Sequence, residues 1–334
     1  MFLSLLGTVH GAVAQGVIWS IMTLGVYITF RILDFPDLTV DGSFATGGAV
    51  AAVLVANHGV NPFLAMVGAL AAGMVCGLIT GFLKAKMKIP GILAGILTMT
   101  ALYSINIRIM SGNAMVPLNG VDTADMLVRQ WIPGISANNV QLLIGGVVAA
   151  IAVVFLYWFF GTELGCAIRA TGNNPYMVRS LGVHTDNTTM VALVISNGLV
   201  ALSGGIFAQV NGSASVDMGV GTIVIGLASV IIGEVVLGRH VGFIPRLVCM
   251  VVGSIIYRVV IAVVLFLGLK ATDMKLISAI IVAIALFLPV AKRGIQRMGG
   301  HHKATRQPAL VPDQAIEDSI DNSDKDPDEP NQKE

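Results

Sequence analysis

The chain has 334 residues, of which 55% are hydrophobic and only 12% are charged, whereas about a quarter of the residues of a soluble globular chain are charged. So much apolar surface requires lipid, and a formal net charge of +1 gives no electrostatic reason to expect nucleic acid as a partner. The cysteines, Cys76, Cys166 and Cys249, are scattered and odd in number, so they predict neither a metal site nor a disulfide framework.

Apolar stretches predict an all-α, polytopic bundle of transmembrane helices. A spanning helix needs about 20 mostly apolar residues, because lipid offers the backbone no hydrogen-bond partners. Stretches of this length occupy residues 12–30, 63–83, 91–110, 140–160, 190–210, 221–237 and 247–268. Two shorter stretches, 44–56 and 276–290, are marginal alone, and the first is a candidate for a broken or re-entrant helix extended by the polar residues before it. We expect nine spans, with eight as the alternative.

Basic residues near the span ends predict the orientation, because Lys and Arg are retained on the cytoplasmic side. With the N-terminus outside, the cytoplasmic ends receive Arg31, Lys84, Lys86, Lys88, Arg169, Arg179, Arg239, Arg246, Lys292, Arg293 and Arg297. The outer ends receive only Arg108, Arg129, Lys270 and Lys275. This asymmetry favours nine spans in a cell inner (plasma) membrane, with the C-terminus in the cytoplasm.

The C-terminal part differs in composition from the rest. Residues 1–298 carry the apolar stretches, whereas residues 299–334 are polar and rich in acidic side chains. A segment with so few apolar groups cannot bury a core. We therefore expect a transmembrane permease domain over 1–298 and a disordered acidic cytoplasmic tail over 299–334.

The longest predicted cytoplasmic loop, 161–189, contains the signals of one short helix with a body over 176–181. Asn174 can cap this helix, Pro175 suits its first position, and Gly182 can adopt the left-handed conformation that ends it. A helix of about two turns is not stable alone in water. It must lean on its own bundle or on another protein, and the residues alone leave both open.

The run GCAIRATGNNP at 165–175, followed by RSLGV at 179–183, resembles the coupling loop of ABC importer permeases of the branched-chain amino acid and ribose permease superfamily. In that family the loop carries a coupling helix that docks in a cleft of the cytoplasmic ATPase. The resemblance assigns the ATPase contact to Arg169, Gly172, Asn173, Asn174, Pro175, Arg179 and Gly182.

A second run, DLTVDGSF at 37–44, resembles the Asp-Leu-Ser-Val-Gly element of sugar permeases. It is closer to a variant in a poorly characterised, amino-acid-transporting branch. Asp41 interrupts the sugar-permease pattern just before its glycine, which puts a sugar substrate in doubt. The stretch 221–238, with Ile232-Gly233-Glu234, resembles the late core of the same branch, and the likeness extends over residues 17–290.

Motifs of enzymatic chemistry are missing from the sequence. It contains no Gly-Lys pair, so the phosphate cradle of an ATPase, which ends in Gly-Lys followed by Ser or Thr, must belong to another polypeptide. It also lacks the His-Glu-x-x-His zinc motif and the Gly-x-Ser-x-Gly nucleophile elbow. We expect a transport subunit that is not an enzyme and binds no cofactor and no metal.

Polar residues inside a membrane are costly, so each is a candidate for the solute path. Arg258 follows Arg246 by twelve residues, about 18 Å along a helix and near mid-membrane. Its guanidinium could bind a solute carboxylate or make a structural or snorkelling contact, and Glu234 should be too shallow to pair with it. The candidates for the solute pathway are Asp37, Asp41, Asn106, Asn197, Glu234 and Arg258.

Asp37 and Asp41 fall on the cytoplasmic side in this topology. A role in the solute path requires their segment to dip back into the membrane. The alternative is an acidic loop that faces water.

The resemblance implies a set of partners. They are a cytoplasmic ABC ATPase subunit, an extracytoplasmic solute-binding protein, a second copy of the permease, a small-molecule solute that is an amino acid or a related compound, and membrane lipid, with no nucleic acid. One alternative is a secondary transporter or channel that works without an ATPase, which the loop at 161–189 disfavours. Another is a membrane scaffold, which the many polar groups within the spans disfavour.

Overall fold

The computed structural model describes residues 2–132, 134–237, 242–267, 276, 278–283 and 287. They all lie in the first of two compact units, Met1–Pro289, whereas the second unit, Val290–Glu334, lies outside them. The expected tail at 299–334 and seven of the fifteen residues of the expected span at 276–290 are therefore outside the described residues. The choice between nine and eight spans and the character of the tail both stay predictions.

Long apolar helices make up most of the described chain. Eight of them within the described ranges are long and apolar enough to cross a membrane. They are α1 (Phe2–Tyr27), α2 (Thr39–Ala56), α3 (Pro62–Ala85), α4 (Gly91–Ile109), α6 (Ala137–Gly161), α9 (Thr185–Asn211), α10 (Thr222–Leu237) and α11 (Phe243–Phe266). These helices coincide with the predicted spans between residues 12 and 268, which confirms the all-α polytopic bundle.

Smaller elements join the long helices. They are η1 (Ile28–Ile32), which continues α1, and α5 (Ala124–Trp131), α7 (Glu163–Asn173), α8 (Pro175–Ser180), η2 (Val216–Gly219), β1 (Met115–Pro117) and β2 (Ser213–Ser215). The two strands pair antiparallel, with Val116 opposite Ala214. They connect the chain beyond α4 to the chain beyond α9, a pairing between distant segments that the sequence did not predict.

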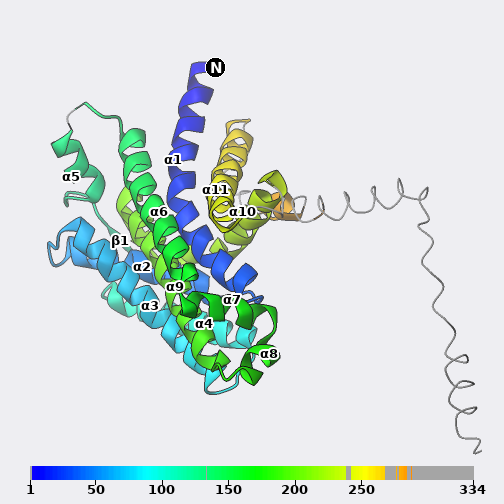
Figure 1. Ribbon diagram of the computed structural model, residues 1–334. Coiled ribbons are helices and arrows are strands. Elements are labelled where there is room, and N and C mark those ends of the chain that lie inside the picture. Colours follow the sequence, from blue (N-terminus) through cyan, green and yellow to red (C-terminus); the bar gives the residue numbers. More distant parts are fainter. Residues whose placement is uncertain are drawn as a thin grey trace, which may run out of the picture. The chain divides into compact units, whose positions relative to one another are not determined.

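Helix α9 is the centre of the bundle. It packs against α1, α2 and α3, and α1 packs in turn against α11, the blue and yellow helices of Figure 1. A Cβ placed on Gly47 of α2 would overlap the carbonyl oxygen of Ala201, and one on Gly73 of α3 would overlap that of Asn197. Small residues permit this close approach of backbones in lipid, where apolar burial alone gives helices no reason to associate.

Buried serine hydroxyls add hydrogen bonds between the same helices. Ser196 of α9 donates to the carbonyl oxygen of Gly25 at 2.7 Å, and Ser203 donates to that of Ile18 at 2.9 Å. Ser254 of α11 donates to the carbonyl oxygen of Gly16 at 2.9 Å. Each hydroxyl thus has a carbonyl oxygen of α1 as its hydrogen-bond acceptor. The bond fixes the position of the neighbouring helix along α1.

The possible break in the second span is not there, because α2 is one continuous helix of 18 residues. Its start is defined by Asp37, whose Oδ1 accepts a hydrogen bond from the backbone nitrogen of Thr39 at 3.0 Å. The discontinuity lies between η2 and α10. There Gly221 has a φ of +86°, a conformation that glycine adopts without the steric cost of a Cβ.

We predict that Gly47→Ala destabilises the bundle. The added methyl group overlaps the backbone of α9, so α2 and α9 must separate, at a cost of about 1–3 kcal/mol. The matched control is Gly146→Ala on α6, where an added Cβ meets nothing within 4 Å. The measurement is the midpoint of thermal unfolding of the purified protein in detergent. Equal midpoints for the two variants would contradict the close contact.

Candidate functional site

The short helix predicted between the fifth and sixth long helices is confirmed as α8. The Oδ1 of Asn174 accepts a hydrogen bond from the backbone nitrogen of Met177 at 3.0 Å, and Pro175 occupies the first turn. Gly182 follows the helix with a φ of +83°. The observed bounds, Pro175–Ser180, differ by one residue from those expected.

The side chains of α8 divide into a buried anchor and an exposed apolar surface. Val178 is buried, so the helix does lean on its own bundle. Tyr176 is 81% exposed and Leu181, just after the helix, is 71% exposed, with Met177 exposed beside them. We call Tyr176, Met177 and Leu181 the α8 apolar surface, which the described residues leave uncovered.

Helix α7 precedes α8 and was not predicted. A Cβ on Gly172 would overlap the carbonyl oxygen of Ile32, so α7 meets the end of η1 at backbone contact. Thr171 shares a hydrogen bond with Thr188 of α9 at 3.0 Å. The glycine of the predicted coupling motif is thus explained by a contact within this chain.

The two arginines of the motif also bind their own bundle. Arg169 Nη2 donates to the carbonyl oxygen of Phe160 at 2.9 Å, and its guanidinium lies 5.3 Å from the centre of the Phe243 ring. Arg179 donates to Thr185 Oγ1 at 2.6 Å and pairs with Asp186 at 3.4 Å. These contacts attach α7 to α6 and α11, and α8 to the first turn of α9.

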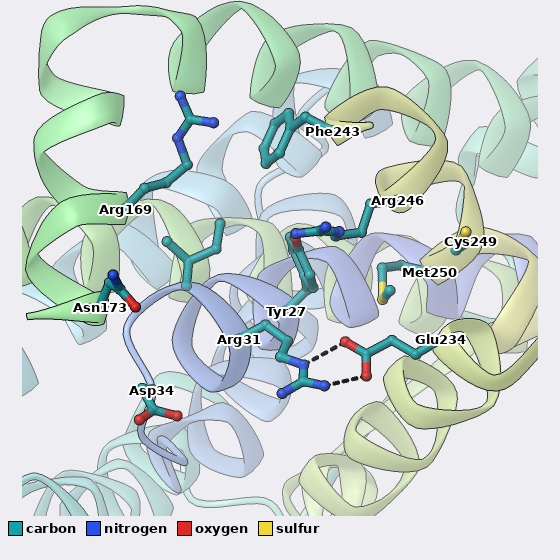
Figure 2. Close-up of a pocket in the computed structure, with 12 residues that line it drawn as sticks. Tyr27, Arg31, Asp34, Arg169, Asn173, Glu234, Phe243, Arg246, Cys249 and Met250 are labelled. Carbon is teal, nitrogen blue, oxygen red and sulfur yellow. Dashed lines mark hydrogen bonds and ion pairs between the residues drawn. The ribbon is translucent and has the colours of Figure 1, made fainter. Parts of the chain in front are cut away.

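A cavity of about 690 Å³ lies beside α7. Figure 2 shows it between the end of α1, η1, α7, α10 and α11, with Arg31 and Glu234 joined across it by a bidentate ion pair. The lining residues are Tyr27, Arg31, Ile32, Asp34, Arg169, Gly172, Asn173, Glu234, Phe243, Arg246, Cys249 and Met250. Three guanidinium groups face two carboxylates there, so the cavity is polar and carries excess positive charge.

Asp37 and Asn197, two of the predicted pathway residues, are in direct contact. Asp37 Oδ2 accepts a hydrogen bond from Asn197 Nδ2 at 2.8 Å, and Asn197 Oδ1 accepts one from Ser43 at 2.7 Å. Asn197 follows Thr185 by twelve residues, about 18 Å into α9. Asp37 is only 1% exposed. The segment before α2 therefore reaches the interior of the bundle, and the alternative of a loop facing water does not hold for Asp37.

Asp41 binds the start of α10. Its carboxylate accepts hydrogen bonds from the backbone nitrogens of Gly221 at 2.9 Å and Ile223 at 2.8 Å, and from the Thr222 hydroxyl at 2.9 Å. A carboxylate is favourable at a helix N-terminus, where amide groups lack partners within the helix. Asp41 thus joins α2 to α10 across the break at Gly221.

The remaining predicted pathway residues lie apart from one another. Glu234 is in the cavity and pairs with Arg31, in agreement with the expectation that it would not pair with Arg258. Arg258 lies over the ring of Trp19. Asn106 is buried in α4, and neither polar atom of its side chain has a hydrogen-bond partner among the described residues. The predicted pathway residues therefore do not form one cluster.

Sequence reasoning missed several residues of these sites. The sequence marks Arg31 and Arg246 only as indicators of orientation, and it does not single out Tyr27 or Trp19. The position of Arg31 at a span end was the available signal, because a charge there needs a partner. Its partner follows 203 residues later, so the sequence could not name it.

The bundle of long apolar helices defines a multi-pass membrane protein. Comparison with known families agrees. The chain belongs to the family described as branched-chain amino acid transport system / permease component, whose model matches residues 8–286. It is therefore a transport permease component by family.

Several curated proteins are similar over most of their length. A tyrosine transport system permease protein of Clostridioides difficile is 41% identical over 80% of this chain and 86% of its own. An uncharacterized protein of Rickettsia prowazekii is 32% identical over 82% and 95%. A ribose import permease protein of Escherichia coli K12 is 26% identical over 86% and 84%.

We predict that Asp41→Ala lowers the free energy of unfolding by about 2 kcal/mol, because three hydrogen bonds at the start of α10 lose their acceptor. Asp41→Asn keeps one acceptor oxygen and should lie between the wild type and Asp41→Ala. Unfolding of the purified protein in detergent measures the order. Asp122→Ala, which removes an exposed carboxylate, is the control, and equal losses for Asp122→Ala and Asp41→Ala would refute the capping role.

Proposed function

We propose that this chain is the permease subunit of an ABC importer, driven by a separate cytoplasmic ATPase, for an amino acid or a related compound. The observation that carries the proposal is the α8 apolar surface. A helix of six residues that is attached to its bundle by Val178 and Arg179, yet exposes Tyr176 and Met177, fits a docking element for another protein better than a piece of the protein's own core.

The contacts of α7 and α8 connect this docking element to the spans. Arg179 attaches α8 to the start of α9, and Gly172 brings α7 against the end of η1. A movement of α8 therefore acts on α9 and on η1 together. Because Arg31 of η1 pairs with Glu234 of α10 across the cavity, the same movement strains that ion pair and changes the opening of the cavity.

Basic side chains support a cytoplasmic position for α8. Lys84 and Lys88 line a second cavity together with Pro175 and Arg179 of α8. Lys88 also pairs with Asp186 at 2.6 Å. Such a concentration of Lys and Arg beside the span ends is typical of the cytoplasmic side of an inner membrane protein.

We infer the solute class and the other partners from the similarity to the relatives. The tyrosine transport relative is more similar to this chain than the ribose import relative, at 41% against 26% identity, which favours an amino acid. Asp41, which interrupts the sugar-permease pattern, caps the start of α10. Because this structural role explains the residue, its presence is not evidence against a sugar as the solute. By the same family relationship we propose a second permease copy and an extracytoplasmic solute-binding protein as partners.

We predict that Arg179→Glu uncouples ATP hydrolysis from uptake. The substitution removes the bond to Thr185 and places a carboxylate beside Asp186, so α8 detaches from α9 while its apolar surface remains. In proteoliposomes with the ATPase and the solute-binding protein, ATP hydrolysis should persist while uptake falls by about tenfold or more, since a lost bond to a charged group is worth that factor. Arg108→Glu, on an exposed position of α4, is the control.

Unchanged uptake and unchanged assembly in Arg179→Glu would count against the assignment of α8 as the coupling helix.

We further predict that Tyr176→Asp weakens binding of the ATPase, because a charge in the α8 apolar surface must be desolvated in the complex. The measurement is the amount of ATPase that co-purifies with the tagged permease. Trp131→Asp is the control, since Trp131 of α5 is 73% exposed. Helix α5 binds the C-terminal end of α9 through Gln209, whereas α8 binds the N-terminal end. Equal losses of ATPase from the two variants would contradict a specific docking surface.

A further inference from the structure

Arg258 of α11 and Trp19 of α1 form a contact deep within the bundle. The guanidinium carbon of Arg258 lies 3.9 Å from the centre of the indole ring. Trp19 is thirteen residues from each end of the span Leu6–Ile32, about 20 Å along the helix. Arg258 follows Phe243 by fifteen residues, about 22 Å. The pair therefore lies near the middle of the membrane.

Both side chains hold a hydrogen-bond donor without a partner. The Nε of Arg258 and the Nε1 of Trp19 are buried, and neither has an acceptor among the described residues. Trp19 as a whole is only 4% exposed. Buried polar groups in proteins are nearly always hydrogen-bonded, and a charged group within a membrane is costly. Two side chains that lie in contact and each hold an unsatisfied donor need an explanation.

The acidic residues predicted for the solute pathway do not supply the missing acceptor. Glu234 of α10 is paired with Arg31. Asp37 is bonded to Asn197 and Thr39, and Asp41 is bonded to the start of α10. In the described part of the chain, Arg258 has the ring of Trp19 as its contact and no ion pair.

We propose that Arg258 and Trp19 form a binding site for the carboxylate of the transported solute, an inference that rests on the proposed function. A carboxylate has two oxygens with several acceptor positions, enough for the guanidinium and the indole N–H together. It also neutralises the buried charge, which a sugar hydroxyl cannot do. The solute class is thus a small organic acid or zwitterion, such as an amino acid.

Two further aromatic rings pack against the ring of Trp19. The ring of Trp19 lies 5.1 Å from that of Phe44 on α2 and 5.3 Å from that of Phe207 on α9, measured between ring centres. These rings cover the indole, so a solute reaches the donors only when they separate. Helix α9 is also the helix to which Arg179 attaches α8, which links separation of the rings to the coupling movement. The rings offer an apolar surface for the remainder of the solute.

The test measures ATP-driven uptake by the complete complex of permease, ATPase and solute-binding protein in proteoliposomes. The probes are radiolabelled L-tyrosine, L-phenylalanine and L-leucine, with D-ribose as the probe without a carboxylate. We expect Arg258→Met to reduce amino acid uptake by about tenfold or more, because a charge-assisted hydrogen bond is lost. Arg258→Lys keeps the charge and should restore part of the uptake. Arg108→Met is the matched control.

The indole is tested separately. Trp19→Phe keeps the aromatic face and removes the N–H, so we expect the KM for uptake to rise about threefold with little change in the maximal rate. Trp158→Phe, at a position 66% exposed on α6, is its control. If Arg258→Met fails to assemble with the ATPase, the Trp19→Phe variant tests the site by itself. An unchanged KM for uptake in Trp19→Phe overturns the proposal.

Other outcomes separate this site from the proposed function. Wild-type amino acid uptake by an assembled Arg258→Met complex overturns the site and leaves the importer intact. Uptake of D-ribose alone also overturns the site while leaving an ATP-driven permease. A wild-type complex that hydrolyses ATP yet imports none of the probes overturns the carboxylate site and the proposed amino acid import together.

Discussion

Direct contact between helix backbones around α9 holds this bundle together. Lipid gives apolar helices no reason to associate, so they must gain their stability from close packing and hydrogen bonds. Glycines of α2 and α3 lie against carbonyl groups of α9, and serine hydroxyls of α9 bond to carbonyl groups of α1. Because so many contacts converge on one helix, a displacement at either end of α9 is transmitted to its neighbours. This arrangement lets a short helix at the start of α9 influence the interior.

Three of the four charged pathway candidates join two structural elements, and Arg258 is the exception. Asp37 joins α2 to α9, Asp41 joins α2 to α10, and Glu234 joins α10 to η1. Each of these acids forms a hydrogen bond or an ion pair with an element distant in the sequence, and this bond holds the two elements together. Among the four charged pathway candidates, only Arg258 contacts a ring and leaves a buried donor without a described partner. An uncompensated charge is unfavourable for stability, which is why we assign it to solute binding.

The sequence predicted what depends on local chemistry. Apolar length gave the spans, and the residues from Asn174 to Gly182 gave α8 almost to the residue, because capping and helix termination act within a few positions. It could not predict features that depend on distant partners. The break at Gly221 follows from a cap that Asp41 supplies from 180 residues away. The inward orientation of Arg169 depends on Phe160 and Phe243, and the strands are too short to stand out from their composition.

Coupling through α8 requires α7 and α8 to face the cytoplasm, where an ATPase can reach them. Cys166 of α7 is exposed, whereas Cys76 and Cys249 are buried, so the native chain carries its own reporter. A membrane-impermeant maleimide applied to membrane vesicles stripped of peripheral proteins reads its side, with Cys166→Ser as the blank. We predict labelling of Cys166 in inside-out vesicles and none in sealed right-side-out vesicles; labelling in the right-side-out vesicles would contradict a cytoplasmic α7.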